Sequence, residues 1–289
     1  MFIGTARIVA SIPSPSGNAI AIGSLRLNAY GLMIALGVIL AVRIAGKGLE
    51  KRGAGTTDDL GAVAMWAVPA GVIGSRLYHV VTDWDRFSGH PGDIVKVWQG
   101  GLGIWGGIAL GVPVGMWAAK RRGLDVPVVV TCSAPAIAAA QAVGRWGNWF
   151  NQELFGKPTT LPWALRIDDA KAAGAGFAPG TTFHPTFLYE SLWCALLCIV
   201  LLAIDSRGSL RPGRLFYLYA AGYTAMRFFI EGLRIDPAHH SGGLRLNQWV
   251  SLAVFTASVL AFVIQVRADR RTASSVASHG EPVQHNESE

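Results

Sequence analysis

Long runs of apolar residues constrain this chain more than any other feature of its sequence. A helix needs about 20 predominantly apolar residues to cross a hydrocarbon core about 30 Å thick. These runs lack the alternation of barrel strands, so their backbone hydrogen bonds must be satisfied within helices. The sequence therefore predicts an all-α, polytopic membrane protein with about seven transmembrane helices. The predicted spans are residues 28–46, 60–81, 102–119, 126–143, 187–204, 215–229 and 246–266.

Composition and charge support this interpretation. Hydrophobic residues make up 51% of the chain and charged residues only 15%, whereas soluble domains carry about 25% charged residues. The net charge of +7 alone would be compatible with a nucleic-acid partner. The basic residues, however, gather after the first, third, fifth and seventh runs, which is the positive-inside pattern of a membrane protein with its N-terminus outside and its C-terminus in the cytoplasm. No nucleic-acid partner is predicted.

This topology divides the chain into three parts. Residues 1–27 are predicted to form an external N-terminal segment, and residues 28–267 the seven-helix transmembrane domain. An external segment, residues 145–184, joins the fourth and fifth spans. Residues 268–289 are polar and low in aromatics, which predicts a disordered cytoplasmic tail.

Polar residues crowd the outer end of the fourth span, in the stretch GRWGNWFNQELFG. Arg145, Asn148, Asn151 and Glu153 fall here, at a depth where charge is costly and is by default a sign of function. An interfacial aromatic belt would explain the two tryptophans of the stretch. It would not explain Gly144, Gly147 and Gly156, whose spacing suits a backbone brought close to another object. We therefore interpret the stretch as part of a site.

The sixth span supplies a second polar set. Tyr219, Tyr223, Arg227 and Glu231 recur every four residues, and Arg234 follows, so they share one helix face. Arg227 and Glu231 could form a buried ion pair that joins two helices. Two arginines to one glutamate nevertheless leave a surplus positive charge, which favours an anion as the ligand.

Further polar residues lie at the same outer level. His184 precedes Pro185, a residue favoured at the first position of a helix, and Glu190 follows within two turns. Tyr30 opens the first span. Arg76, toward the outer end of the second span, could pair with an acid such as Glu190 or extend to the interface.

These sets converge at the outer leaflet. Surplus arginines beside acids and amides, lined by aromatic residues, predict a pocket for an anionic lipid headgroup, because guanidinium groups match phosphate oxygens. The sequence shows no cluster with metal-ligand spacing, and we predict neither a metal nor another cofactor.

Six motifs carry a more specific resemblance. They are YGLMIALG, GSRLYHV, WQGGLGIWGG, GRWGNWFNQELFG, HPTFLYES and RFFIEGLR, in order between about Ile12 and Arg267. In them the chain resembles the prolipoprotein diacylglyceryl transferases of the bacterial cytoplasmic (inner) membrane. The resemblance implies transfer of the diacylglyceryl group from phosphatidylglycerol to the lipobox cysteine thiol of a prolipoprotein signal peptide. A thioether forms, and glycerol phosphate leaves, at a site toward the outer leaflet among membrane lipids.

The resemblance also implies which residues form the site. Arg145 and Arg227 would stabilise the charge that grows on the phosphate in the transition state. The implied catalytic residues are Tyr30, Arg145, Glu153, His184, Arg227 and Glu231. The implied phosphatidylglycerol-binding residues are Arg145, Asn148, Gly156, Glu190, Arg227 and Arg234. The polar stretch itself adds Asn151 to this predicted set.

One position departs from the family pattern. The family commonly carries a histidine before the glycine pair of the third span, a proposed base for the thiol, and this chain has Trp105 there. A thiol with a pKa near 8.5 is only partly ionised at neutral pH, so some activation is expected. Either His184, Tyr30 or a carboxylate removes the proton, or the positive field of the arginines lowers the pKa of the thiol.

Two other functional classes fit a membrane protein with charged spans. A lipid transporter or flippase would often show internal repeats or charge near the midplane, and here the charges gather toward one face. A non-catalytic anionic-lipid-binding protein is the second alternative, because Trp105 replaces the expected base.

Overall fold

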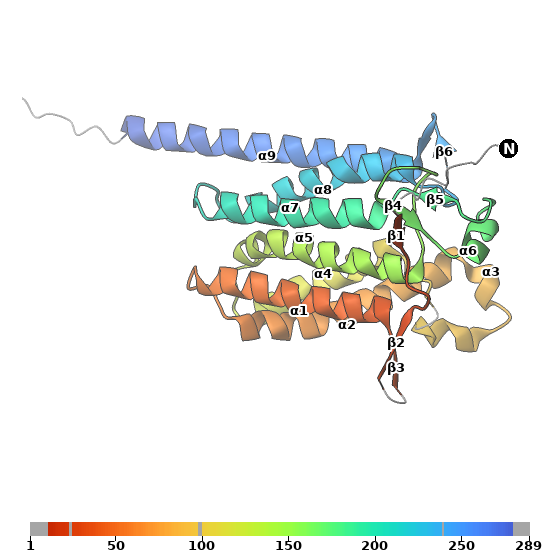
Figure 1. The fold of residues 1–289 in the computed structure, drawn as a ribbon. Helices are drawn as coiled ribbons and strands as arrows, with labels where there is room; N and C mark the ends of the chain where they lie inside the picture. Colours follow the sequence, from red (N-terminus) through yellow and green to blue (C-terminus); the bar gives the residue numbers. More distant parts are fainter. Residues whose placement is uncertain (1–10, 23–24, 98–99, 239, 280–289) are drawn as a thin grey trace, which may run out of the picture.

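The computed structural model describes residues 11–22, 25–97, 100–238 and 240–279, and this part of the chain is mainly helical. Its long helices run roughly along one axis (Figure 1). They are α1 (Ala29–Glu50), α2 (Thr57–Thr82), α4 (Ile104–Arg121), α5 (Val126–Asn151), α7 (Thr186–Asp205), α8 (Arg214–Leu233) and α9 (Leu246–His279).

The helices confirm a multi-pass helical architecture. Five of them, α1, α2, α5, α7 and α9, are long and apolar enough to cross a membrane. The predicted spans 102–119 and 215–229 coincide with α4 and α8, which do not meet the same criterion. α4 has 18 residues and ends in Lys120 and Arg121, and α8 contains Arg227 and Glu231. Charged residues are costly within a membrane-spanning helix.

Short elements gather at one end of the helices, on the right in Figure 1. A three-stranded sheet has the order β1-β4-β5, and two hairpins pair β2 with β3 and β6 with β7. The strands are β1 (Ser11–Pro13), β2 (Ala19–Ile22), β3 (Leu25–Asn28), β4 (Ala164–Arg166), β5 (Thr182–Phe183), β6 (His240–Ser241) and β7 (Leu244–Arg245). The short helices are α3 (Trp84–Phe87), η1 (Pro91–Val95) and α6 (Asp169–Gly174).

α9 leaves at the opposite end. It continues to His279 and so includes residues 268–279, for which the sequence predicts a tail. The rest of the predicted tail, residues 280–289, and the first ten residues of the predicted external segment lie outside the described residues.

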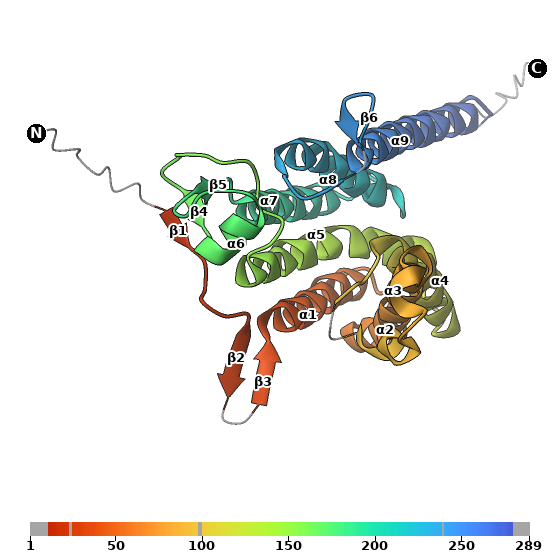
Figure 2. The same cartoon turned by 90° about the vertical axis from the view of Figure 1, so that its right-hand side faces the viewer.

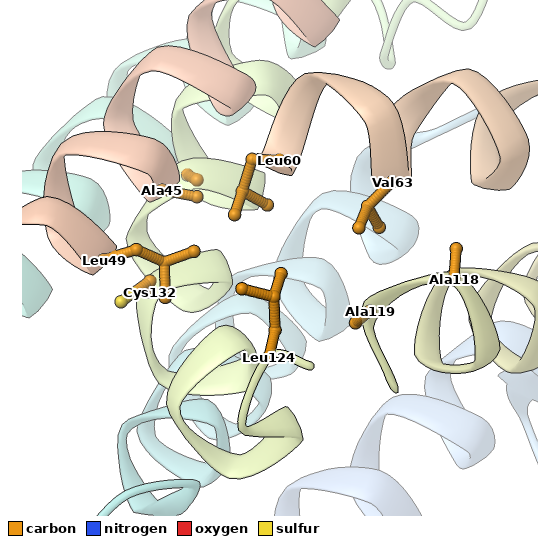
Figure 3. Close-up of a cluster of buried hydrophobic side chains, with 9 residues drawn as sticks. Ala45, Leu49, Leu60, Val63, Ala118, Ala119, Leu124 and Cys132 are labelled. Atoms are coloured by element: carbon orange, nitrogen blue, oxygen red, sulfur yellow. The ribbon is translucent and has the colours of Figure 1, made fainter. Parts of the chain in front are cut away.

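The helices pack as two groups. α2 and α4 pair closely with each other, whereas α1, α5, α7, α8 and α9 form the larger group and α4 touches α5 over few residues (Figure 2). The groups meet in a buried cluster near the end where α9 leaves. Figure 3 shows its small and branched side chains, among them Ala45, Leu49, Leu60, Ala119 and Cys132. Small residues let helix backbones approach closely in a membrane protein.

Glycines set the approach of α2 to α4. A Cβ on Gly106 would lie 2.1 Å from the backbone oxygen of Gly74, and one on Gly74 would lie 2.3 Å from that of Gly106. We expect Gly106→Val to force the helices apart and to lower the free energy of unfolding by about 1–3 kcal/mol, measured by denaturation in detergent. Gly61→Val, also on a helix but with open space around it, is the control. Equal stability of the two variants would contradict this packing.

Candidate functional site

The stretch GRWGNWFNQELFG begins as helix and ends as a tight turn. α5 extends to Asn151, beyond the predicted span, so Arg145 and Asn148 lie on its last turns. Gln152 and Leu154 then adopt φ angles of 51° and 58°, a conformation uncommon outside glycine. The turn brings Glu153 back onto the helix, where its Oε1 accepts hydrogen bonds from Asn148 Nδ2 at 2.9 Å and Asn151 Nδ2 at 3.2 Å.

Glu190, on the second turn of α7, lies between two arginines from different helices. Its Oε2 pairs with Nε of Arg145 on α5, and its Oε1 lies 2.7 Å from Nη1 of Arg227 on α8. Only 4% of Glu190 is exposed. Arg145 also donates to the hydroxyl of Tyr223 at 3.3 Å. The two arginines predicted to share a phosphate therefore lie at the same end of the helices and share a buried carboxylate.

The ion pairs continue along α8. Nη2 of Arg227 lies 2.7 Å from Oε2 of Glu231, which is fully buried. The other Glu231 oxygen lies 2.9 Å from Nε of Arg245 in β7, and Nη1 of Arg234 approaches Oε2 at 3.6 Å. The predicted Arg227–Glu231 pair thus exists, but as one link in a longer chain.

Asp236, just after α8, closes that chain. It accepts two hydrogen bonds from Arg234, at 2.6 and 2.8 Å, and one from Arg245 at 3.0 Å. Burial alone would raise the pKa of Asp236, but the hydrogen bonds from Arg234 and the charges of Arg234 and Arg245 lower it below its usual value. A lowered pKa means that the carboxylate stabilises the fold above its unfolded-state pKa and loses that effect as the pH falls through its folded-state pKa.

The connected chain carries an excess of positive charge. It joins four arginines (Arg145, Arg227, Arg234 and Arg245) to three carboxylates (Glu190, Glu231 and Asp236), which leaves one positive charge. A further carboxylate, that of Glu153, is linked to Arg145 through Asn148, so the excess holds for the ion-paired residues alone.

A small cavity opens beside this network. Its volume is about 10 Å³, close to the least space that one water molecule needs. The cavity must therefore widen before it can admit a phosphate. Its lining residues are Arg145, Asn148, Leu154, Thr186, Phe187, Glu190 and Arg234.

Tyr30, Gly156 and His184 take positions around the network. The ring of Tyr30 packs on Gly147 of α5, where an added Cβ would lie only 2.6 Å from a ring carbon. Gly156 forms a backbone bridge with Arg234, and an added Cβ would lie 2.8 Å from that of His184. Nδ1 of His184 lies 3.1 Å from the Tyr189 hydroxyl.

Arg76 does not belong to the site network, and the suggested pair with Glu190 is wrong. Its guanidinium donates to four backbone carbonyls in the connection between α2 and α4, those of Asp93, Ile94, Gly100 and Gly101. Arg76 therefore anchors that connection. The loop offers carbonyl groups in the position where the sequence suggested an acidic partner.

Sequence reasoning placed Tyr223 on the polar face of the sixth span without assigning it to the site, and it missed two further residues of the network. Arg245 and Asp236 fall in the connection to α9, where no periodicity marks them. Gln152, in the signature stretch, also has a structural role: its side chain donates to the carbonyl of Pro15 and to Asp168, both at 2.8 Å.

We expect Arg245 to be needed for stability. It is 6% exposed, and besides Glu231 and Asp236 it holds the carbonyl of Arg234 at 2.7 Å. Arg245→Met leaves a buried carboxylate without its cation, so we expect a loss of about 3–5 kcal/mol in the free energy of unfolding, measured in detergent. Arg86→Met, at an exposed arginine, should have little effect. Similar stability of the two variants would contradict a role for Arg245.

Together the fold and the site define a multi-pass helical membrane protein with a buried, positively charged network at one end. The family described as prolipoprotein diacylglyceryl transferase matches residues 18–264, and the chain belongs to this family of transferases. It is 50% identical over 265 residues to a phosphatidylglycerol–prolipoprotein diacylglyceryl transferase of Streptomyces griseus, covering 90% of this chain and 79% of the relative. It is 49% identical to the relative of the same name in Frankia alni, covering 89% of this chain and 68% of the relative. It is also 49% identical to phosphatidylglycerol–prolipoprotein diacylglyceryl transferase 1 of Streptomyces coelicolor, covering 90% of this chain and 75% of the relative.

Proposed function

We propose that this protein transfers the diacylglyceryl group of phosphatidylglycerol to the lipobox cysteine thiol of a prolipoprotein signal peptide. The observation that carries the proposal is the shared binding of Arg145 and Arg227 to opposite oxygens of buried Glu190. Guanidiniums from two helices are thereby held close together, with donors suited to phosphate oxygens. Membership of the transferase family favours this reaction over lipid transport or passive lipid binding.

The chemistry is a displacement at the glyceryl carbon bonded to the phosphate oxygen. The thiol sulfur forms a carbon–sulfur bond as the carbon–oxygen bond breaks, and the electron pair leaves with glycerol phosphate. The thiol proton passes to a base or to water. The phosphodiester monoanion becomes a phosphomonoester that approaches a dianion, so the arginines stabilise the transition state more than the bound lipid.

Within the network the other residues hold the arginines and the headgroup. Glu190 and Glu231 orient the guanidiniums, and Glu153 orients Asn148, which lines the cavity. Asn151 supports Glu153 in the turn. Gly156 lets the backbone pass under His184 beside Arg234.

We also propose the membrane topology. The catalytic domain, residues 28–267, crosses the membrane seven times. Residues 1–27 and 145–184 then lie outside, and the tail, residues 268–289, lies in the cytoplasm. Support comes from basic residues at the end of the bundle opposite the site, where Arg52 pairs with Asp205 and both Arg211 and Arg214 pair with Asp269. The positive-inside rule assigns that end to the cytoplasm of a bacterial inner membrane, which leaves the site at the outer leaflet.

The thiol base is testable through His184. Trp105 lies on the first turn of α4 and is half exposed, and an indole cannot accept the proton. If the arginine field activates the thiol, we expect His184→Ala to keep the pH–rate profile of wild type, measured with a lipobox peptide at saturating lipid. Activity that depends on a base falls at low pH as the base becomes protonated. Loss of this acidic limb of the profile in His184→Ala, with Tyr189→Phe unchanged, would instead make His184 the base.

The activity itself is tested with purified protein, phosphatidylglycerol and a synthetic lipobox peptide. Mass spectrometry should detect one diacylglyceryl group added to the peptide cysteine and none added to a cysteine-to-serine peptide. A mass gain on neither peptide, from protein that is folded, would overturn the proposal.

A further inference from the structure

A long groove follows the seam between the two helix groups. It has a volume of about 630 Å³ and lies among α2, α4 and α5, with Phe216 of α8 also contributing. α2 and α4 pack tightly on each other, whereas α4 touches α5 over few residues. The groove therefore lies between the α2–α4 pair and the larger group, where the two groups are not in close contact.

The lining of the groove is apolar. Serines 75 and 133 supply the polar side chains among its lining residues, and the others are aliphatic, glycine, methionine or phenylalanine. Two of the helices that form it, α2 and α5, are long and apolar enough to cross a membrane. A groove of this kind takes an apolar occupant, because a polar one would lose its hydrogen bonds to water.

The dimensions select the kind of occupant. Along α2 the lining runs from Leu60 to Ser75, which is about 22 Å at 1.5 Å per residue. A groove of this length with an apolar lining suits an extended hydrocarbon chain.

The groove leads toward the arginine network along one face of α5. Val126, Val130, Ser133 and Ile137 line it at spacings of three and four residues. Asn148 lies eleven residues beyond Ile137, close to three full turns, and so occupies the same face. Asn148 also lines the small cavity beside Arg145. A lipid whose phosphate meets the arginines can thus extend a chain along this face.

We propose that the groove holds one acyl chain of the phosphatidylglycerol substrate and sets the chain length that the enzyme accepts. The inference rests on the proposed function and deepens it. The phosphate is held by the arginines, and the acyl chain lies between α4 and α5 with its methyl end toward Leu60 and Ala119. A side chain that blocks the groove therefore limits the length of the acyl chain that can bind in it.

A side chain that fills the middle of the groove tests this assignment. Ser133 lies seven residues from Val126 on α5, about 10 Å along a groove about 22 Å long. With Ser133→Phe we expect kcat/KM for dipalmitoyl phosphatidylglycerol to fall more than about ten-fold, since each methylene kept out of an apolar site weakens binding about four-fold. Dioctanoyl phosphatidylglycerol, whose chains stop short of the obstruction, should change less than about two-fold. Leu196→Phe, at an exposed site on α7 outside the groove, is the matched control.

Crosslinking provides a second measurement that needs no variant. Phosphatidylglycerol with a diazirine at the end of one acyl chain should label peptides from residues 104–137 in the wild-type protein. Labelling confined to α7 or α9, or an equal effect of Ser133→Phe on both lipids, would overturn the inference. Because wild type would still transfer both lipids in that case, this failure is distinct from failure of the proposed function, in which wild type transfers neither.

Discussion

Arg145→Ala should lower the rate of diacylglyceryl transfer by about 10²- to 10³-fold, the usual cost of losing one preorganised donor to a developing negative charge. Arg145 pairs with Glu190, donates to Tyr223 and lines the small cavity. Its guanidinium is therefore held in place before the lipid arrives. Because the phosphate gains charge only as the carbon–oxygen bond breaks, we expect the loss mainly in kcat rather than in KM.

The measurement compares three variants in the peptide assay. Arg145→Lys keeps the charge but not the planar fork, so we expect it to recover only part of the rate. Arg166→Ala removes an exposed arginine at the same end of the molecule, paired with Asp169 at 3.2 Å, and should keep the wild-type rate. If Arg145→Ala retains full turnover, Arg145 does not stabilise the transition state.

The main helices could be predicted from the sequence because apolar length is a local property. Each predicted span coincides with a long helix, and the three-and-four spacing placed Tyr223, Arg227 and Glu231 on one face of α8. The prediction failed where partners are remote. Arg76 finds backbone carbonyls instead of Glu190, and Arg245 reaches Glu231 from a hairpin fourteen residues further along the chain. Ion pairing between separate elements leaves no periodic signal.

The end of the fourth span shows a second limit. Apolarity declines after residue 143, yet α5 continues to Asn151. The polar residues there are satisfied by tertiary contacts: Glu153 folds back on Asn148, and Gln152 binds the segment at Pro15. A hydropathy boundary marks where lipid contact ends, whereas the helix boundary depends on these later contacts.

The second large effect is expected from Glu190→Gln. This carboxylate is 4% exposed and lies between Arg145 and Arg227. Its neutralisation leaves the connected network with four arginines and two carboxylates. Arg227 keeps Glu231 as a partner, whereas the buried guanidinium of Arg145 loses its carboxylate. We expect a loss of about 3–5 kcal/mol in the free energy of unfolding, measured in detergent without lipid. Asp85→Asn, at an exposed carboxylate of α3, should leave stability unchanged.

Added phosphate should partly reverse that loss. If the gap between Arg145 and Arg227 accepts a phosphate group, the anion can take the place of the missing carboxylate charge in Glu190→Gln. A ligand that binds the folded state alone stabilises it in proportion to the logarithm of its concentration. We therefore expect phosphate to raise the stability of Glu190→Gln more than that of wild type, and chloride at equal ionic strength to raise it less. Equal responses to the two salts would mean that the arginines bind charge without recognising phosphate, which would contradict the headgroup site.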